Sequence, residues 1–217
     1  MTELPDWLHR NVSEPRFRPY LHATGGGPEA ALELYQWNIA VASAFYTPLH
    51  WLEITLRNAL HHELRRYFAR PDWWTAAPLA DNGRRAVARA QDQVARRKAA
   101  GCPDDLVTEL SLGFWVSLLS RGRAYDRTLW VPALHRAFPH QSGRRHDLHA
   151  ELVPILHFRN RIMHHEPIHQ LDLRNHHGTV YRLLGYVSPR ISTLAAQLDR
   201  TPTLLDNRPD VAGGDAS

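Results

Sequence analysis

The sequence has little cysteine and lysine and no long apolar run, and these absences exclude several classes of protein. Cys102 is the only cysteine, so neither an intrachain disulfide nor a cluster of thiolate metal ligands can form. No apolar run reaches the ~18 residues that a membrane-spanning helix needs. The N-terminus also has neither the basic nor the apolar segment of a signal peptide. We therefore expect a cytoplasmic protein.

Strand signals are scarce as well. No alternating run of apolar and polar residues is flanked by hairpin turns, whereas helical periodicity occurs along most of the chain. A length of 217 residues with 43% apolar side chains is enough for one compact domain. The sequence therefore predicts an all-α protein with a helical bundle over residues 28–199, an irregular N-terminal arm over residues 1–27 and a disordered tail over residues 200–217.

Proline and glycine set the boundaries of the expected helices. Pro28 suits a first helical turn, Pro48 is expected to break or kink a helix, and Pro167 prevents another from continuing. The expected helices span about residues 28–46, 49–68, 84–100, 126–138, 146–166 and 179–198, and a further one begins after a cap at Asp104 or Asp105. The helix over residues 126–138 should be interrupted near Pro132, and the last one should bend at Pro189.

Arginine carries nearly all of the positive charge. The chain has 26 lysines and arginines, of which Lys98 is the only lysine, and a net charge of +4. An excess of arginine suits phosphate binding, and codon bias in a GC-rich genome is the alternative explanation. One expected basic helix carries Arg84, Arg85, Arg89, Arg96, Arg97 and Lys98. A second basic group comprises Arg121, Arg123, Arg127, Arg144 and Arg145. Such groups either guide RNA or form solvated helix faces.

Six of the seven tryptophans fall into two sets. Trp73 and Trp74 follow a helix end, so this is the pair that we expect to be exposed. Apolar helical contexts favour a place in the core for Trp37, Trp51, Trp115 and Trp130.

Residues 157–167 hold an unusual combination of charged and polar side chains on an expected helix. On a helical wheel Arg159 falls within the apolar stripe, and Asn160 and His164 share the shoulder of that stripe. His157 lies near them on the same side. Because an arginine that faces a core or an interface is costly without compensation, Arg159 should have a partner.

The expected helix over residues 49–68 supplies candidates for that partner. Glu53 lies within its apolar face, and Arg57 lies beside that face one turn later. We expect Glu53 to pair with Arg159, with Arg57 or with both, and a polar pocket to form where the two helices meet. The alternative is an ion-pair network that only fixes the register of the helices.

The histidines beside this segment could have other roles. His165 could cap the C-terminus of the helix, where the dipole favours an imidazolium. His165 and His169 are four residues apart, a spacing that can bind a metal on a helix, but Pro167 lies between them. We therefore expect neither a metal nor another cofactor at this site.

The same segment resembles a known family. Residues 158–168, Phe-Arg-Asn-Arg-Ile-Met-His-His-Glu-Pro-Ile, look like the Abi-like (abortive-infection) proteins, and the order Arg159-Asn160-x-x-x-His164 is similar to the R-x(4–6)-H motif of HEPN ribonucleases. The resemblance extends over about residues 12–195, through segments 12–17 with 20, 34–38 with 44–45, 52–58, and 112–115 with 118–119.

The resemblance implies a HEPN-like helical bundle and a homodimer that brings two motifs together. It also implies a role in phage defence or in a toxin–antitoxin system, with a protein or a small RNA as the possible antitoxin. HEPN relatives cut RNA without a metal, so Arg159 and His164 would be catalytic and Asn160 would assist. Glu53 and Arg57 would lie in the active-site surround, and His157 and His165 are expected beside them.

In that chemistry the 2′-hydroxyl of the RNA is the nucleophile, histidine transfers protons, and arginine neutralises charge on the phosphorane. The expected products carry a 2′,3′-cyclic phosphate and a 5′-hydroxyl. Two other interpretations remain open at this point. One is a non-catalytic helical module that binds RNA or a protein, and the other is a metal-dependent hydrolase built on the histidine clusters.

Overall fold

The structure, a computed structural model, describes residues 6–97, 101–121 and 124–210. Within these ranges every regular element is a helix, and the buried apolar side chains form one core. The α-helices are α1 (Asp6–Val12), α2 (Glu14–Ala23), α3 (Pro28–Phe68), α4 (Asp81–Arg97), α5 (Pro103–Glu109), α6 (Leu112–Ser117), α7 (Arg145–Met163), α8 (Leu173–Val187), α9 (Pro189–Ala196) and α10 (Thr201–Asp206). Shorter turns of helix are η1 (Trp73–Thr75), η3 (Asp126–Trp130) and η4 (Leu134–Ala137). The prediction of one all-α domain is confirmed.

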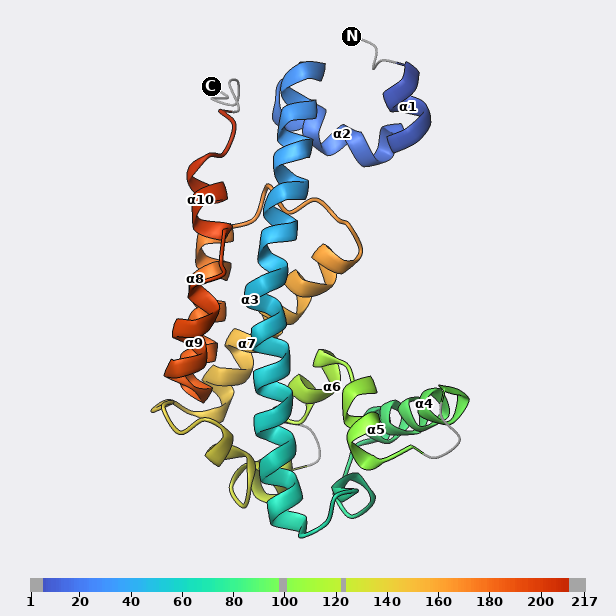
Figure 1. Cartoon of the computed structure of the whole chain (residues 1–217), viewed down its shortest axis with the longest axis vertical. Coiled ribbons are helices and arrows are strands. Elements are labelled where there is room, and N and C mark those ends of the chain that lie inside the picture. The colour runs from blue at the N-terminus through green and yellow to red at the C-terminus, as the bar shows by residue number, and fades with distance from the viewer. Residues whose placement is uncertain (1–5, 98–100, 122–123, 211–217) are drawn as a thin grey trace.

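Helix α3 runs through the whole length of the molecule (Figure 1) and has 41 residues. Its apolar face, in the half that begins at Leu49, is buried as predicted. This face consists of Leu49, Leu52, Leu56, Leu60 and Leu64. The predicted break at Pro48 is wrong, because α3 passes through this residue. Proline lacks the N–H that a helix interior needs. Here the ring is buried beside the fully buried Phe45, and this packing offsets the missing bond.

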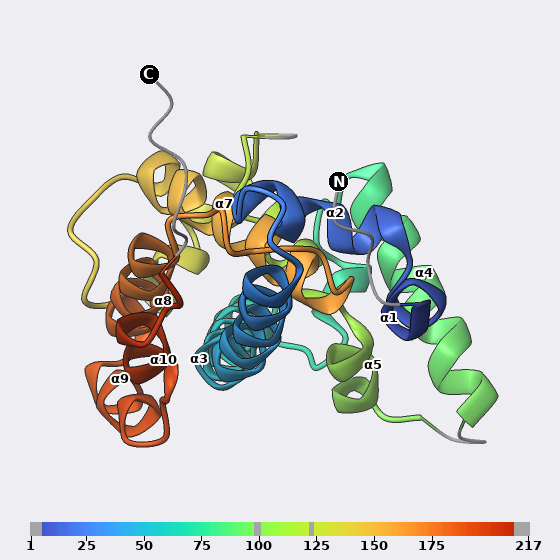
Figure 2. The ribbon, with the colours of Figure 1, turned by 90° about the horizontal axis from the view of Figure 1, so that it is seen from above.

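The other helices pack along α3 on two sides. Figures 1 and 2 both place α8, α9 and α10 on one side and α4 and α5 on the other. Helix α7 is joined to α3 by an edge-to-face contact between Phe45 and Phe158, whose ring centroids lie 4.8 Å apart. None of the helices within the described ranges is long and apolar enough to cross a membrane.

The predicted irregular N-terminal arm is wrong over residues 6–23, which form α1 and α2. Pro15 lies in the first turn of α2, where a missing N–H costs little. The side chains of Phe17 and Tyr20 are 0% and 2% exposed, and both rings pack against Tyr35 of α3. Tertiary burial therefore stabilises a helix that also has Pro19 in its interior.

The predicted disordered tail is wrong for residues 201–206, which form α10, and residues 211–217 lie outside the described ranges. Leu205 is 9% exposed, and the indole Nε1 of Trp37 donates a hydrogen bond of 2.8 Å to the carbonyl of Leu204. The helix expected over residues 179–198 is also two helices. They meet at Ser188, which has extended backbone angles and whose hydroxyl caps α9.

Trp73 and Trp74 are buried, at 0% and 7% exposure, so the expectation that they are exposed is wrong. The ring of Trp73 packs against those of Phe114 and Trp115, and its Nε1 donates to Nδ1 of His61. Turn η1 therefore contributes both tryptophans to the core.

Candidate active site at the end of α7

Helix α7 ends at Met163, three residues earlier than predicted, and His164 is its C-cap residue. His165 has a positive φ of 57°, so the chain turns sharply after the C-cap residue His164. The amide of Glu166 then bonds the carbonyl of Arg161 at 2.9 Å, and the amide of His165 bonds that of Ile162 at 3.0 Å. This pair of bonds is a Schellman motif, in which glycine is usual at the position of His165. His165 thus caps α7 through its backbone rather than through a charged ring.

Arg159 pairs with Glu53, as predicted from the two apolar faces. The Nε of Arg159 donates to Oε2 of Glu53 over 3.2 Å, and the two side chains are 29% and 26% exposed. No described residue accepts a hydrogen bond from either Nη of Arg159. The pair therefore fixes the guanidinium by one edge and leaves its outer nitrogens free to bind an anion.

Arg57 does not share this pair. Its Nε donates to Oδ1 of the neighbouring Asn58 at 3.3 Å, and no described contact joins it to Glu53. Of the pairings open from the sequence, the one between Glu53 and Arg159 is observed. Arg57 lies one turn further along α3, half-buried, at the edge of the site.

The three polar side chains of the motif lie on one shoulder of α7. His157 and Asn160 are three residues apart on the helix, and His164 follows Asn160 by four, so all of them project from neighbouring turns. His157 and His164 are exposed and Asn160 is half-buried. None of the three side chains bonds a described residue. The last turns of α7 and its C-cap therefore carry an arginine, an amide and two imidazoles, and among the described residues the bond between Arg159 and Glu53 is the one hydrogen bond or ion pair that their side chains make.

The loop that follows the motif is fixed by residues whose role the sequence analysis did not identify. The buried amide oxygen of Asn38 accepts hydrogen bonds from the backbone of Ile168 and His169, at 2.8 and 3.0 Å. Nη1 of Arg16 donates to the carbonyl of His165 at 2.8 Å. A polar residue at position 38, within the apolar face of α3, is the signal that could have found this contact.

His169 is buried in the core, whereas His165 is exposed. His169 is 1% exposed, and its ring packs against that of Tyr20 in a tilted arrangement with the centroids 4.7 Å apart. Burial, assisted by the positive charge of Arg208, lowers the pKa of His169 to about 4. Within the described residues, no three histidine, cysteine, aspartate or glutamate side chains gather in a group that could hold a metal ion.

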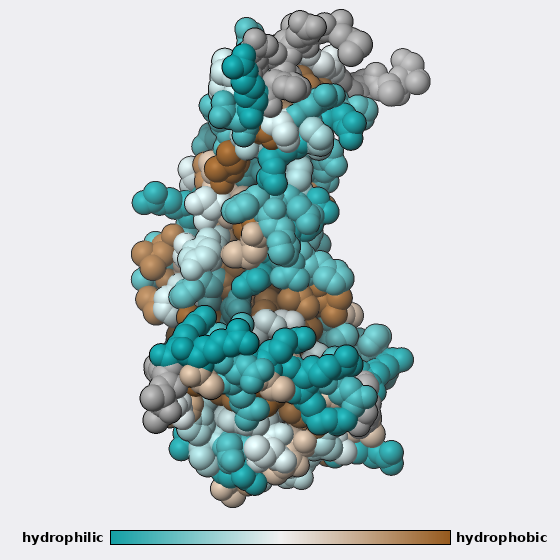
Figure 3. Space-filling view, turned by 90° about the vertical axis from the view of Figure 1, so that its right-hand side faces the viewer, coloured by the Kyte–Doolittle hydropathy of each residue, from teal (hydrophilic) through white to brown (hydrophobic). Residues whose placement is uncertain are grey.

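The predicted basic helix is observed as α4, whose arginines are exposed: Arg84, Arg85, Arg89, Arg96 and Arg97. Lys98 lies outside the described residues. Arg84 pairs with Asp81 and Arg97 with Glu109, whereas Arg89 and Arg96 have no described partner. Figures 1 and 2 place α4 and the C-terminal end of α7 on the same side of α3. On that side, Figure 3 shows a band of hydrophilic side chains across the lower half of the molecule.

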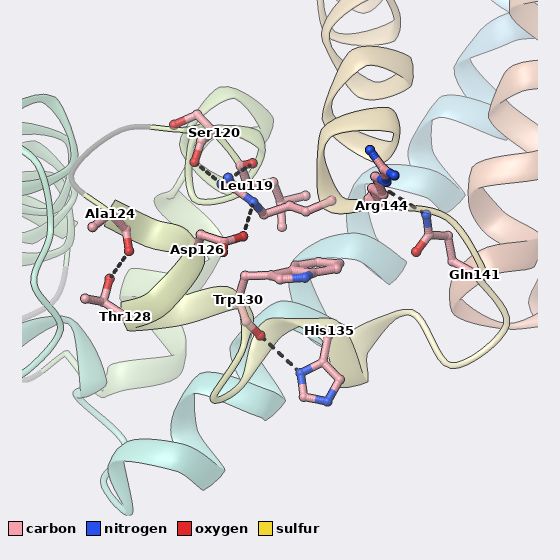
Figure 4. A network of polar contacts seen from close by, with 10 residues as sticks. Leu119, Ser120, Ala124, Asp126, Thr128, Trp130, His135, Gln141 and Arg144 are labelled. Carbon is pink, nitrogen blue, oxygen red and sulfur yellow. Dashed lines mark hydrogen bonds and ion pairs between the residues drawn. The ribbon is translucent and has the colours of Figure 1, made fainter.

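The second basic group is not one continuous surface. Arg145 is 10% exposed; its Nη1 donates to the carbonyls of Leu119, at 3.1 Å, and Ser120, and its Nε pairs with Asp126 at 3.1 Å. Figure 4 shows these acceptors beside the start of α7. Arg145 is therefore a structural residue that joins α7 to η3, and neither role expected for its group, RNA guidance or a solvated helix face, fits it. Arg123 lies outside the described residues.

The chain was also compared with known proteins. No family model, no curated protein and no solved structure matches it.

Proposed function

We propose that this chain is a metal-independent endoribonuclease whose catalytic residues are Arg159, Asn160 and His164. The observation that carries the proposal is the arrangement at the end of α7, where an exposed histidine adjoins an amide and an arginine with free outer nitrogens. Phosphate ester chemistry on RNA needs groups of these kinds, because the nucleophile is already part of the substrate.

In the proposed reaction an imidazole removes the proton of the 2′-hydroxyl, and O2′ attacks the adjacent phosphorus. The bond between phosphorus and O5′ then breaks, and a second acid gives a proton to the leaving O5′. The products are a 2′,3′-cyclic phosphate and a 5′-hydroxyl. The Nη atoms of Arg159 bind the phosphate oxygens as charge develops on them, and Asn160 orients the phosphate or His164.

Two proton-transfer groups are needed, and a homodimer supplies them from two copies of His164. The exposure of His164 at the end of its helix leaves it accessible to a second protomer. Glu53 serves as a positioning residue that holds Arg159 through Nε. Arg57, His157 and His165 surround the site.

The proposed substrate is RNA, which Arg89 and Arg96 of α4, exposed and without a partner among the described residues, would help to bind. On the strength of the resemblance to Abi-like and HEPN proteins, we propose that the cleavage serves abortive infection or a toxin–antitoxin system. An antitoxin, either a protein or a small RNA, would then control it.

RNA cleavage in excess EDTA tests the proposal. Wild type is expected to cut single-stranded RNA and leave cyclic-phosphate ends, and His164→Ala is expected to be inactive with an unchanged circular dichroism spectrum. His62→Ala, which removes another exposed histidine on α3, is the matched control and should keep full activity. A requirement for magnesium together with 5′-phosphate products would reject the mechanism.

A second function is favoured by the half-buried pair of Glu53 and Arg159, which also suits a purely architectural role. In that case the chain is a non-catalytic helical module that binds RNA or a protein. The same variants distinguish the two functions, because a binding module cuts no RNA and binds it equally well with alanine at position 164.

A further inference from the structure

A pocket of about 490 Å³ opens beside the motif, between α2, α3 and the end of α7. Most of its wall is aromatic or aliphatic, and the residues that matter here are Tyr20, Tyr35, Ile39, Tyr46 and Met163. Its volume lies within the range of sites that enclose small organic groups. Figure 3 shows hydrophobic residues exposed at mid-height on this face, above the hydrophilic band.

The pocket is lined by α3 and the end of α7, the two helices that also carry the pair of Glu53 and Arg159. On α3, Tyr46, His50 and Glu53 follow one another at spacings of four and three, so they share one face. On α7, Met163 lies four residues, ~6 Å, beyond Arg159. A phosphate on the Nη atoms of Arg159 would therefore have its neighbouring nucleotide at the mouth of the pocket.

Polar groups at the pocket point to a ligand that is flat and carries hydrogen-bonding edges. The Oδ1 of Asn38 already accepts two backbone N–H bonds, whereas no described residue accepts a bond from its Nδ2. Ser43, Arg16 and Glu166 add a hydroxyl, a guanidinium and a carboxylate at the rim. Donors and an acceptor around aromatic walls are what an unstacked base requires.

We infer that this pocket receives one unpaired nucleobase of the RNA, next to the phosphate held by Arg159. The inference rests on the proposed ribonuclease function and specifies its substrate as single-stranded RNA at that nucleotide. Tyr46, which is 57% exposed and stacked on His50, forms the outer wall on which the base would lie. Its exposure allows truncation without a loss of core packing.

The test measures binding of short single-stranded RNA that is 2′-O-methylated throughout, so that no 2′-hydroxyl can attack. A set of such oligonucleotides carries one abasic site moved stepwise along the chain. For wild type, one abasic position is expected to weaken binding about tenfold, as the loss of one stacked base does. Tyr46→Ala should bind the intact RNA about tenfold more weakly and show no further loss with the abasic RNA.

Two further variants make the test specific. Tyr67→Ala removes another exposed tyrosine, at 46% exposure, from the far end of α3, and it should behave as wild type. Ser43→Trp fills the pocket from its exposed edge and should bind intact RNA as weakly as wild type binds the abasic RNA. If the abasic penalty persists in Tyr46→Ala, or if no position shows one in wild type, the inference is wrong.

This outcome is separate from that of the cleavage assay. If wild type cuts RNA but Tyr46→Ala keeps the abasic penalty, the ribonuclease proposal holds and the base pocket is rejected. If the penalty disappears in Tyr46→Ala but wild type cuts no RNA, the pocket is a base-binding site and the ribonuclease proposal is rejected.

Discussion

Three hydrogen-bond donors converge on the carboxylate of Asp199, between α9 and α10, and its replacement by asparagine tests what holds the C-terminal segment in place. The side chain of Asp199 is 3% exposed. Its Oδ2 accepts from Nε2 of His177 at 2.6 Å and from the hydroxyl of Tyr181 at 2.7 Å, and its Oδ1 accepts from the amide of Thr201 at 2.8 Å. Asparagine keeps the shape but replaces one acceptor by a donor, so at least one of these bonds is lost.

The magnitude follows from the pKa of Asp199. Burial raises this pKa, but the hydrogen bonds from His177, Thr201 and Tyr181 lower it by more than burial raises it. The net effect is a pKa of about 2 instead of 3.8. A difference of about 2 units between the folded and unfolded chains corresponds to about 2 kcal/mol of stability. Because the folded pKa is the lower one, this stabilisation is present above about pH 4 and disappears as the pH falls towards about 2.

Urea unfolding, followed by tryptophan fluorescence, measures the effect. Asp199→Asn is expected to lower the free energy of unfolding by about 2–4 kcal/mol at neutral pH, and the difference from wild type should shrink near pH 2. The control is Asp206→Asn on α10, where an exposed carboxylate pairs with Arg174 at 2.7 Å and the cost should stay below about 1 kcal/mol. Equal losses in the two variants, or a difference that does not change with pH, would refute the reasoning.

Three more predictions concern the site and its support. Glu53→Gln removes the charge that holds Arg159 and should lower kcat for RNA cleavage about tenfold with little change in RNA binding. The control is Glu151→Gln, which removes the partner of Arg182, a side chain as exposed as that of Glu53, and should leave kcat within about twofold. His165→Gly relieves the positive φ and should raise the free energy of unfolding by about 1 kcal/mol. Asn38→Ala leaves the buried N–H groups of Ile168 and His169 without an acceptor and should lower the free energy of unfolding by about 2–4 kcal/mol. Thermal or urea unfolding measures the effects of both His165→Gly and Asn38→Ala.

Part of this arrangement could be predicted from the sequence because burial imposes a period on helices. The leucines of α3 recur every three or four residues, and Glu53 interrupts their face at a position that demands a partner. Arg159 interrupts the face of α7 in the same way. Two inward charges of opposite sign, in a bundle of this size, leave few pairings, and the one observed was among them.

The predictions from sequence were wrong where contacts between residues distant in sequence outweigh the conformational preference of the local segment. Pro48 disfavours a helix interior by its own chemistry, but the packing around it keeps α3 continuous. Helices α2 and α10 form because their apolar side chains, such as Phe17 and Leu205, are buried in the core that α3 shares with them. The sequence around Arg145 predicts an exposed charge, because its hydrogen-bond acceptors lie about 25 residues away and only the folded chain brings them close.

The pairing of Arg159 bears on both candidate functions. An arginine whose whole guanidinium is enclosed by carboxylates can only support the fold, whereas one that is bound through Nε alone keeps a fork of two Nη atoms. The second case is observed within the described residues, and the exposed His164 lies five residues further along the chain, at the C-cap of α7. A residue that only fixed helix register would not need the fork. The geometry therefore favours a role for Arg159 on a bound phosphate, with Glu53 setting its direction.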